Sequence, residues 1–189
     1  MSLVEEYRDD DLMLDFYPNF IPEDVALSLF KVLMSDTNWP RALSDRRRTK
    51  SLYGDEGLVY NINWYGKTST YPVTSWSDFP ILEAVKNLVA ESTGERYTVC
   101  VVQHYPNGTV GINPHRDREM VHGTIIAGIS LGSTRKLRMS RGCKNIELNL
   151  TPGSLYLLRP PTNDKWAHSI SKDETTEPRI SLTFRNYVA

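Results

Sequence analysis

Two side chains that commonly bind metal ions stand two residues apart in the sequence His115-Arg116-Asp117. In an extended chain, residues i and i+2 point to the same side, so both side chains could reach one ion. His168 is a third candidate ligand, in a separate stretch that we expect to be a strand. Two histidines and one carboxylate form the facial triad of non-heme iron(II) oxygenases, although zinc accepts the same ligand types. The HxD pair alone is more often an ordinary surface turn. A metal site is therefore indicated only if other residues of the sequence also fit one.

The last expected strand, Arg179–Val188, begins with strictly alternating polar and apolar side chains. Its apolar face can pack against a core, whereas its polar face carries an arginine at each end: Arg179, Ser181, Thr183 and Arg185. Such a polar face in a terminal strand is usually exposed to solvent. A barrel that holds an anion in its interior needs the same pattern, because a guanidinium group binds a carboxylate through two hydrogen bonds. The residues alone leave both interpretations open.

A second expected strand, Tyr97–Tyr105, has a similar arrangement at its end. Gln103 and Tyr105 fall on one face and could donate hydrogen bonds to a bound acid. The alternative is an ordinary strand end with a tyrosine at its rim. Arg179 follows His168 by only a short loop, so these two residues could line one cavity.

Two helices and a series of short strands must position these side chains. Helices are expected over residues 22–34 and 79–91, with a proline in each first turn, Ser77 or Asp78 as the cap of the second helix, and Gly94 at its end. The segment between them, about 40–76, should form short surface strands and loops. Short strands separated by Gly, Pro and Asn turns then favour a sandwich or jelly roll: Tyr97–Tyr105, Thr124–Leu131, Lys136–Ser140, Asn145–Leu150, Ser154–Arg159, Trp166–Ser171 and Arg179–Val188.

The composition is that of an ordinary globular protein. The 189 residues are enough for one domain, the net charge is -1, and any basic surface must therefore be local. Cys100 and Cys143 form no CxxC pair, which argues against a disulfide framework and a zinc knuckle. The N-terminal residues are acidic where a signal peptide would be basic, and no apolar run approaches the length of a membrane span. We expect a soluble intracellular protein, cytoplasmic or nuclear, with no membrane partner.

Several of these motifs occur together, in order and with matching spacing, in a known family. From about Tyr53 to Tyr187, the stretches HRDRE, ISLGSTRKLRM, TPGSLYLL, WAHSI and PRISLTFR resemble the AlkB family of iron(II)/2-oxoglutarate dioxygenases. Upstream, YGDEGLVYN resembles the part of these enzymes that covers the target base. The resemblance implies a mainly β fold with flanking helices (α+β): a double-stranded β-helix, or jelly roll, with an N-terminal helical support and a nucleotide-recognition lid. It also implies one dioxygenase domain over residues 1–189, with the lid at about 40–76 and the jelly-roll core at 97–188.

The resemblance assigns roles to individual residues. It implies that His115, Asp117 and His168 bind iron(II) and form the catalytic centre. The remaining matched positions would bind the cosubstrate 2-oxoglutarate, with Arg179 and Tyr105 on its distal carboxylate, Arg185 near the end next to the metal and Thr183 beside it. Gln103 stands where the family usually has asparagine, and Ser181 at a position that is often asparagine; both remain polar. Molecular oxygen is the second cosubstrate that this chemistry requires.

The implied reaction is oxidative demethylation of N-alkylated bases in DNA or RNA, with release of formaldehyde, succinate and CO2. We expect the enzyme to be a monomer. Tyr60 matches a position that contacts the target base and Glu119 an acidic residue that can bond to it. Ile62 departs from relatives that carry a stacking aromatic there, and Trp64 could substitute.

Two basic runs interleaved with aromatics fit a nucleic-acid backbone or, equally, a solvated face: residues Arg41, Arg46, Arg47, Arg48 and Lys50, and residues Arg135, Lys136, Arg138, Arg141 and Lys144. The alternatives are an oxygenase acting on protein or another substrate, and a jelly-roll binding module without turnover.

Overall fold

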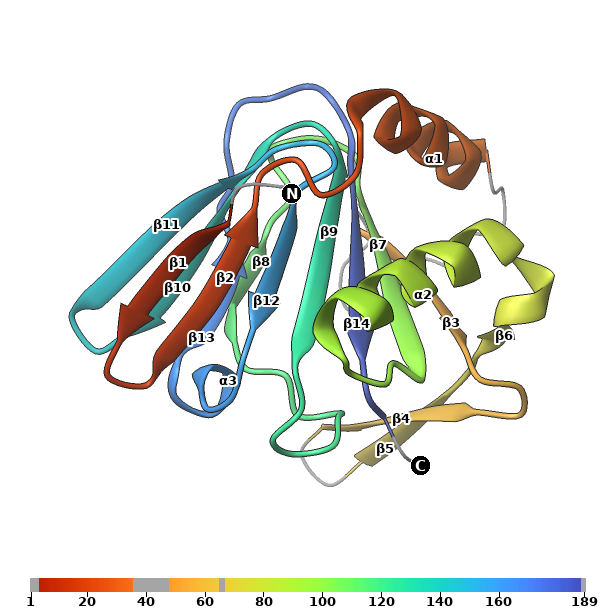
Figure 1. The fold of residues 1–189 in the computed structure, drawn as a ribbon, viewed down its shortest axis with the longest axis horizontal. Helices are drawn as coiled ribbons and strands as arrows, with labels where there is room; N and C mark the ends of the chain where they lie inside the picture. The colour runs from red at the N-terminus through yellow and green to blue at the C-terminus, as the bar shows by residue number, and fades with distance from the viewer. Residues whose placement is uncertain (1–3, 36–47, 65–66, 188–189) are drawn as a thin grey trace.

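The structure is a computed structural model, and it describes residues 4–35, 48–64 and 67–187 (Figure 1). Two sheets make up most of the fold. The larger sheet has eight strands in the order β1-β2-β12-β9-β14-β7-β3-β6, and the smaller has four in the order β11-β10-β13-β8. A separate hairpin, β4-β5, lies below β3 and β7 in Figure 1. This arrangement is the expected jelly roll.

The strands of the larger sheet come from both halves of the chain. They are β1 (Glu5–Asp9), β2 (Leu12–Tyr17), β3 (Thr49–Gly54), β6 (Thr74–Ser75), β7 (Val99–Tyr105), β9 (Ile126–Gly132), β12 (Leu155–Leu158) and β14 (Arg179–Arg185). The smaller sheet contains β8 (Ile112–His115), β10 (Arg135–Arg141), β11 (Lys144–Leu150) and β13 (Ala167–Ile170). The hairpin is β4 (Val59–Trp64) with β5 (Lys67–Pro72). The three helices are α1 (Glu23–Ser35), α2 (Pro80–Thr93) and the short α3 (Thr162–Lys165).

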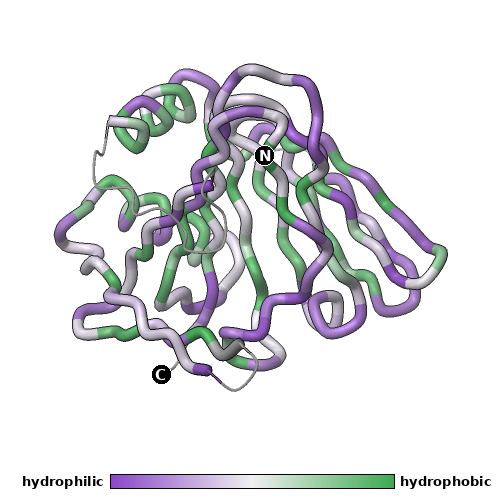
Figure 2. The backbone as a smooth tube through the Cα atoms, turned by 180° about the vertical axis from the view of Figure 1, so that it is seen from behind, coloured by the Kyte–Doolittle hydropathy of each residue, from purple (hydrophilic) through white to green (hydrophobic). Residues whose placement is uncertain are grey.

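Apolar side chains bury both faces of the larger sheet. On the outer face, α1 and α2 pack over β9, β14 and β7 (Figure 1), through residues such as Leu29, Leu82 and Phe184. On the inner face, Leu14, Leu148 and Trp166 belong to a second cluster that fills the space between the two sheets. Figure 2 shows this distribution, with hydrophobic residues along the central strands and hydrophilic ones at the loops and hairpin tips.

Both expected helices form within two residues of the expected bounds. Pro80 is the first residue of α2, and Gly94 ends it in the left-handed conformation with φ of 69°, which a residue without Cβ adopts at no steric cost. The expected cap of α2 is wrong. Ser77 and Asp78 form a 3-10 turn, Trp76–Asp78, whose own cap is Ser75, and Phe79 precedes α2 without a side-chain cap.

Three short strands were not expected from the sequence. Two of them, β1 and β2, form a hairpin that contains the acidic N-terminal residues. Strand β2 then pairs with β12 through Leu14↔Leu158 and Phe16↔Tyr156. Strand β8 contains Pro114 and is only four residues long, so no alternation marks it. Among the described residues, no helix has both the length and the apolar character needed to cross a membrane.

Candidate metal centre

His115, Asp117 and His168 come together where the two short strands β8 and β13 pair. His168 lies opposite His115 in the register of this pair, and Asp117 follows β8 by two residues. One ligand atom from each residue lies within 4.8 Å of the others. The His115 Nε2 is 3.6 Å from Asp117 Oδ1, and the His168 Nε2 is 3.8 Å from Asp117 Oδ2. The expected trio is therefore one cluster and not a surface turn.

Neighbouring groups hold this cluster in a conformation suited to one ion. The His115 Nδ1 is 2.9 Å from the Asn113 carbonyl oxygen, which directs Nε2 toward the other two residues. Asn163, in α3, fixes the backbone of Asp117 twice, because its side chain accepts from the Asp117 amide at 3.0 Å and donates to the carbonyl at 2.8 Å. These contacts leave the imidazole Nε2 atoms and the carboxylate facing one another.

The protonation states also suit a cation. Burial lowers the pKa of His168 to about 4, so its imidazole is neutral at pH 7 and has a lone pair to donate. Burial alone would raise the pKa of Asp117, but Arg185 and the two histidines outweigh it and hold that pKa below its usual value. Asp117 Oδ2 is buried with no hydrogen-bond donor among the described residues. A buried, unsatisfied acceptor between two imidazoles fits a divalent metal ion.

Arg179, at the start of β14, presents a second unsatisfied group. Its side chain is fully buried; Nε donates to Ser130 Oγ at 2.8 Å and one terminal nitrogen to Ser181 Oγ at 3.4 Å. The other terminal nitrogen, Nη1, is buried without a partner, and no carboxylate of the described residues pairs with this guanidinium. Burial lowers the pKa of Arg179, as expected for a cation that lacks a counter-charge. The arrangement suits an anionic ligand.

Tyr105 and Gln103 lie beside Arg179, because β7 pairs with β14 in the register Arg179↔Tyr105 and Ser181↔Gln103. The Tyr105 hydroxyl donates to Gln103 Oε1 at 2.8 Å, and the Arg179 guanidinium lies 5.2 Å from the Tyr105 ring centroid. The polar face of β14 is buried throughout, including Thr183 at 6% exposure. The solvent-exposed interpretation of this strand is therefore wrong.

Arg185, at the other end of β14, joins the metal cluster to the β4-β5 hairpin. One terminal nitrogen is 2.8 Å from Asp117 Oδ1, and the other donates to the Tyr60 hydroxyl at 2.9 Å. Tyr60 is 2% exposed, its ring centroid lies 4.7 Å from that of Tyr187, and burial raises its pKa to about 12. Tyr60 thus contacts an active-site cation in this structure, whereas the sequence had suggested contact with substrate. Glu119 is half-buried, and the side chain of Trp64 lies outside what the structure describes.

The two basic runs have different surroundings. Arg41, Arg46 and Arg47 lie outside the described residues, but Lys50 faces the site from β3, opposite Gln103, with its Nζ 4.4 Å from the Tyr71 ring centroid. In the second run Arg135 is buried and three residues have acidic partners, whereas Arg138 is exposed and bonds to Asn145.

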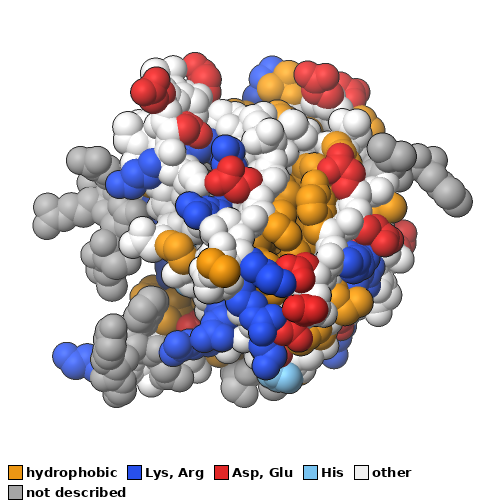
Figure 3. All heavy atoms as spheres, turned by 90° about the vertical axis from the view of Figure 1, so that its left-hand side faces the viewer, with side chains coloured by type: hydrophobic (Ala, Val, Ile, Leu, Met, Phe, Trp, Pro, Cys, Tyr) orange, Lys and Arg blue, Asp and Glu red, His pale blue; other side chains and the backbone are white. Residues whose placement is uncertain are grey.

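In that run, Lys136 pairs with Glu147, Arg141 with Asp11 and Lys144 with Asp9. The hairpin-tip side in Figure 3 accordingly shows basic and acidic side chains next to each other. Most of this run is therefore paired or buried, and Arg138 is an exposed arginine without an acidic partner among the described residues.

Two residues that support the site were not predicted from the sequence. Ser130 accepts from Arg179, and Asn163 fixes Asp117. Ser130 had a detectable signal, because it is the one hydroxyl residue within the otherwise apolar or glycine strand β9. Asn163 had none, since the turn that presents it contains no pattern.

Comparisons with known proteins agree with this geometry. The model of the 2OG-Fe(II) oxygenase superfamily matches residues 13–185. DNA oxidative demethylase ALKBH2 of Mus musculus is 36% identical over 151 residues, covering 73% of this chain and 61% of that protein. Alpha-ketoglutarate-dependent dioxygenase alkB homolog 3 of Homo sapiens is 27% identical over 190 residues, covering 89% and 64%. The chain thus spans about three fifths of the length of these relatives.

A solved structure, that of OsALKBH1, has the same fold. It superposes with a TM-score of 0.65 at 12% identity and covers 98% of this chain and 100% of that one. At this identity the likeness supports the fold alone.

Proposed function

The chain belongs to the AlkB family of the 2OG-Fe(II) oxygenase superfamily, and from this premise we propose that it oxidatively demethylates N-alkylated bases in nucleic acid. The observation that carries the proposal is the pairing of two unsatisfied groups in one interior: the His115–Asp117–His168 cluster and the unpaired Arg179 guanidinium. A zinc site would need only the first of these. A 2-oxo acid that chelates iron and extends a distal carboxylate needs both.

In this proposal, His115, Asp117 and His168 hold iron(II). When bound, iron(II) with 2-oxoglutarate and O2 supplies the oxidation of a methyl C–H, with succinate, CO2 and formaldehyde as products. The protein's part is to bind, orient and exclude water. Asn163 and the Asn113 carbonyl orient two of the ligands, and the burial of the whole polar face of β14 keeps bulk water away.

The distal carboxylate of 2-oxoglutarate would bind Arg179 through its free nitrogen and Tyr105 through its hydroxyl. The Tyr105 hydroxyl donates its single hydrogen to Gln103 Oε1 in this structure, so that hydrogen would turn from Gln103 to the carboxylate on binding. Thr183 lies buried between the two ends of β14. Arg185 holds the pKa of Asp117 down and pairs with Oδ1, so the unsatisfied Oδ2 is the oxygen that would be available to hold the metal.

Nucleic acid is the substrate class that the hairpin side supports. Lys50 is a half-buried cation that forms no ion pair within 4.0 Å among the described residues, although the charge of Glu119 acts on it, and Tyr71 of the β4-β5 hairpin lies against it. Such a pair suits a phosphate beside a stacked base. ALKBH2 and alkB homolog 3 are named for oxidative demethylation of DNA and for 2-oxoglutarate-dependent dioxygenation. We propose that Tyr60 and Trp64, in the 40–76 lid, and Glu119, next to the metal ligands in sequence, surround the target base. We also propose that the protein is a monomer with one domain and that it acts inside the cell.

The test is a reaction of the purified chain with iron(II), 2-oxoglutarate, ascorbate and methylated DNA and RNA oligonucleotides. We expect formaldehyde and succinate in equal amounts and an oligonucleotide lighter by one methylene group, measured by mass spectrometry. The matched controls are the unmethylated oligonucleotide and the H115A variant, both of which should be silent. Succinate formation that no oligonucleotide stimulates would move the substrate to another class, and full activity of H115A would refute the metal assignment.

A further inference from the structure

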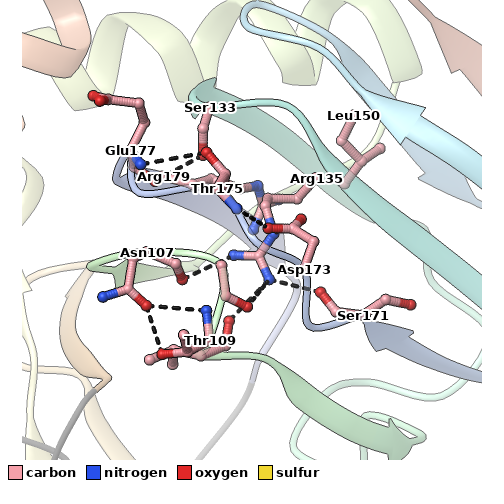
Figure 4. Close-up of polar contacts among 12 residues, drawn as sticks. Asn107, Thr109, Ser133, Arg135, Leu150, Ser171, Asp173, Thr175, Glu177 and Arg179 are labelled. Atoms are coloured by element: carbon pink, nitrogen blue, oxygen red, sulfur yellow. Dashed lines mark hydrogen bonds and ion pairs between the residues drawn. The ribbon is translucent and has the colours of Figure 1, made fainter.

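Arg135 is a fully buried cation that the proposed chemistry leaves without a role. It is the first residue of β10, in the smaller sheet, and it is 1% exposed. Figure 4 shows its guanidinium between the loop that follows β7 and the loop that precedes β14. Those loops begin and end at the two residues proposed to hold the distal carboxylate, since β7 ends at Tyr105 and β14 begins at Arg179.

The guanidinium contacts backbone on both loops at once. On the first loop it donates to the carbonyl oxygens of Asn107, Gly108 and Val110, at 3.2, 3.2 and 2.9 Å. On the other side it donates to the Ser171 carbonyl at 2.6 Å and pairs through Nε with Asp173 at 2.7 Å. A guanidinium offers five N–H donors in a fixed plane, and a lysine could not reproduce this set.

The two loops also bond directly to each other around this centre. The Gly108 amide donates to the Thr175 carbonyl at 2.7 Å, and the Asp173 amide donates to the Gly108 carbonyl at 2.9 Å. A Cβ atom on Gly108 would lie 2.6 Å from the Asp173 carbonyl oxygen, so the backbones have approached as closely as they can. Arg135 therefore lies at the centre of a rigid junction between the ends of β7 and β14.

The Tyr105 ring connects this junction to the anion site. The guanidinium carbons of Arg135 and Arg179 lie 5.9 Å and 5.2 Å from the ring centroid. The guanidinium carbon of Arg48 lies 6.0 Å from the same centroid, so three cations surround one ring. Arg135 has a carboxylate partner in Asp173, whereas no carboxylate of the described residues pairs with Arg179. Pairing Arg135 with Asp173 leaves Arg179, which is nearer to the ring, with its charge available for a ligand.

We propose that Arg135 and Asp173 are positioning residues for 2-oxoglutarate, which hold Tyr105 and Arg179 at the separation that its distal carboxylate requires. The inference rests on the proposed function, because it takes the ligand of Arg179 to be that carboxylate. Neither residue touches the ligand or the metal. Their effect is confined to the cosubstrate end of the site.

The experiment compares D173N and R135K with R138K, a matched control on the same strand whose arginine is exposed and bonded only to Asn145 among the contacts described. Asp173 is 38% exposed at its side chain, so D173N is expected to fold even if R135K does not. Calorimetry without oxygen measures 2-oxoglutarate binding to the protein loaded with Mn(II), and a separate titration measures Mn(II) binding. Turnover gives KM for 2-oxoglutarate and kcat.

We expect D173N and R135K to weaken 2-oxoglutarate binding and raise its KM by roughly tenfold, the lower range for supporting residues. Mn(II) affinity and kcat at saturation should stay within about twofold of R138K. Unchanged 2-oxoglutarate affinity, or equal losses of Mn(II) and 2-oxoglutarate binding, would overturn the inference. If the unaltered chain binds 2-oxoglutarate but does not demethylate oligonucleotides, the proposed substrate fails while the binding comparison still decides the role of Arg135.

Discussion

Two buried arginines lie on the same face of β14, and their surroundings differ in one respect. Arg185 has an anionic partner in Asp117 and a hydroxyl acceptor in Tyr60. Arg179 has two serine hydroxyls and no carboxylate among the described residues. Removing a charge from water costs several kcal/mol unless a counter-charge is present. The arginine at the metal end therefore has its counter-charge within the protein, although Asp117 Oδ2 still lacks a donor there, whereas the arginine at the other end gains a counter-charge only from a ligand.

Because of this difference, Arg185 should contribute mainly to the stability of the fold, and Arg179 mainly to the affinity for a ligand. The Arg185–Asp117 pair should stabilise the metal-free protein, since each charge compensates the other. The unpaired charge of Arg179 should destabilise it, and binding of a carboxylate would recover that free energy. Substitutions at the two ends should consequently affect stability and ligand affinity in opposite proportions, which the following variants examine.

The largest effect is expected at Asp117, which serves both the metal and Arg185. D117N removes a ligand and leaves the buried Arg185 charge unpaired, so we expect demethylation below about 1% of the unaltered rate, beyond the loss typical of supporting residues. The metal-free protein should also lose about 3 kcal/mol in free energy of unfolding. Activity assays and urea unfolding measure the two effects. D164N, which changes a nearby partly exposed acid, is the control, and retention of metal binding by D117N would contradict the ligand assignment.

R179M should abolish cosubstrate binding while sparing the fold. Truncating one partner of a buried charge pair costs about 2–5 kcal/mol, which is roughly 30-fold to several thousandfold in affinity. Because this charge has no partner without ligand, the metal-free protein should be unaffected or slightly more stable. Calorimetry with 2-oxoglutarate and urea unfolding provide the two readouts, with R138M as the control. A marked loss of stability would mean that Arg179 is structurally paired after all.

R185M should give the reverse pattern. It leaves the Asp117 carboxylate buried without its cation, so the free energy of unfolding should fall by about 3–5 kcal/mol in the metal-free protein. Added Mn(II) supplies a new counter-charge and should recover part of this loss, which thermal unfolding with and without the ion would reveal. If R185M and R179M had the same free energy of unfolding, the proposed difference between a charge-paired Arg185 and an unpaired Arg179 would be wrong.

The sequence predicted the residues of both ends but not their electrostatic states. Local sequence patterns marked the HxD pair, the distal His168 and the alternation of β14. The structure contains the metal cluster and the alternating strand that these patterns predict. That Arg179 lacks a carboxylate while Arg135 has Asp173 depends on which loops meet in space, and no periodicity encodes that. The same reason explains part of the second basic run, because Arg141 and Lys144 pair with acids more than 100 positions away, at the tip of β1-β2.

The smallest effect is expected at Tyr60, which links the hairpin to the metal end. Y60F keeps the ring against Tyr187 but removes the hydroxyl that accepts from Arg185, and such a bond to a charged group contributes about 1–2 kcal/mol. If that hydroxyl acts only through Arg185, Y60F should lower stability by this amount, leave 2-oxoglutarate affinity unchanged and leave the KM for the oligonucleotide unchanged. A stable Y60F with a raised oligonucleotide KM would instead place the hydroxyl on the target base. The two ends of β14 would then be more alike, because each would be completed by a ligand: the cosubstrate at Arg179 and the substrate at Tyr60.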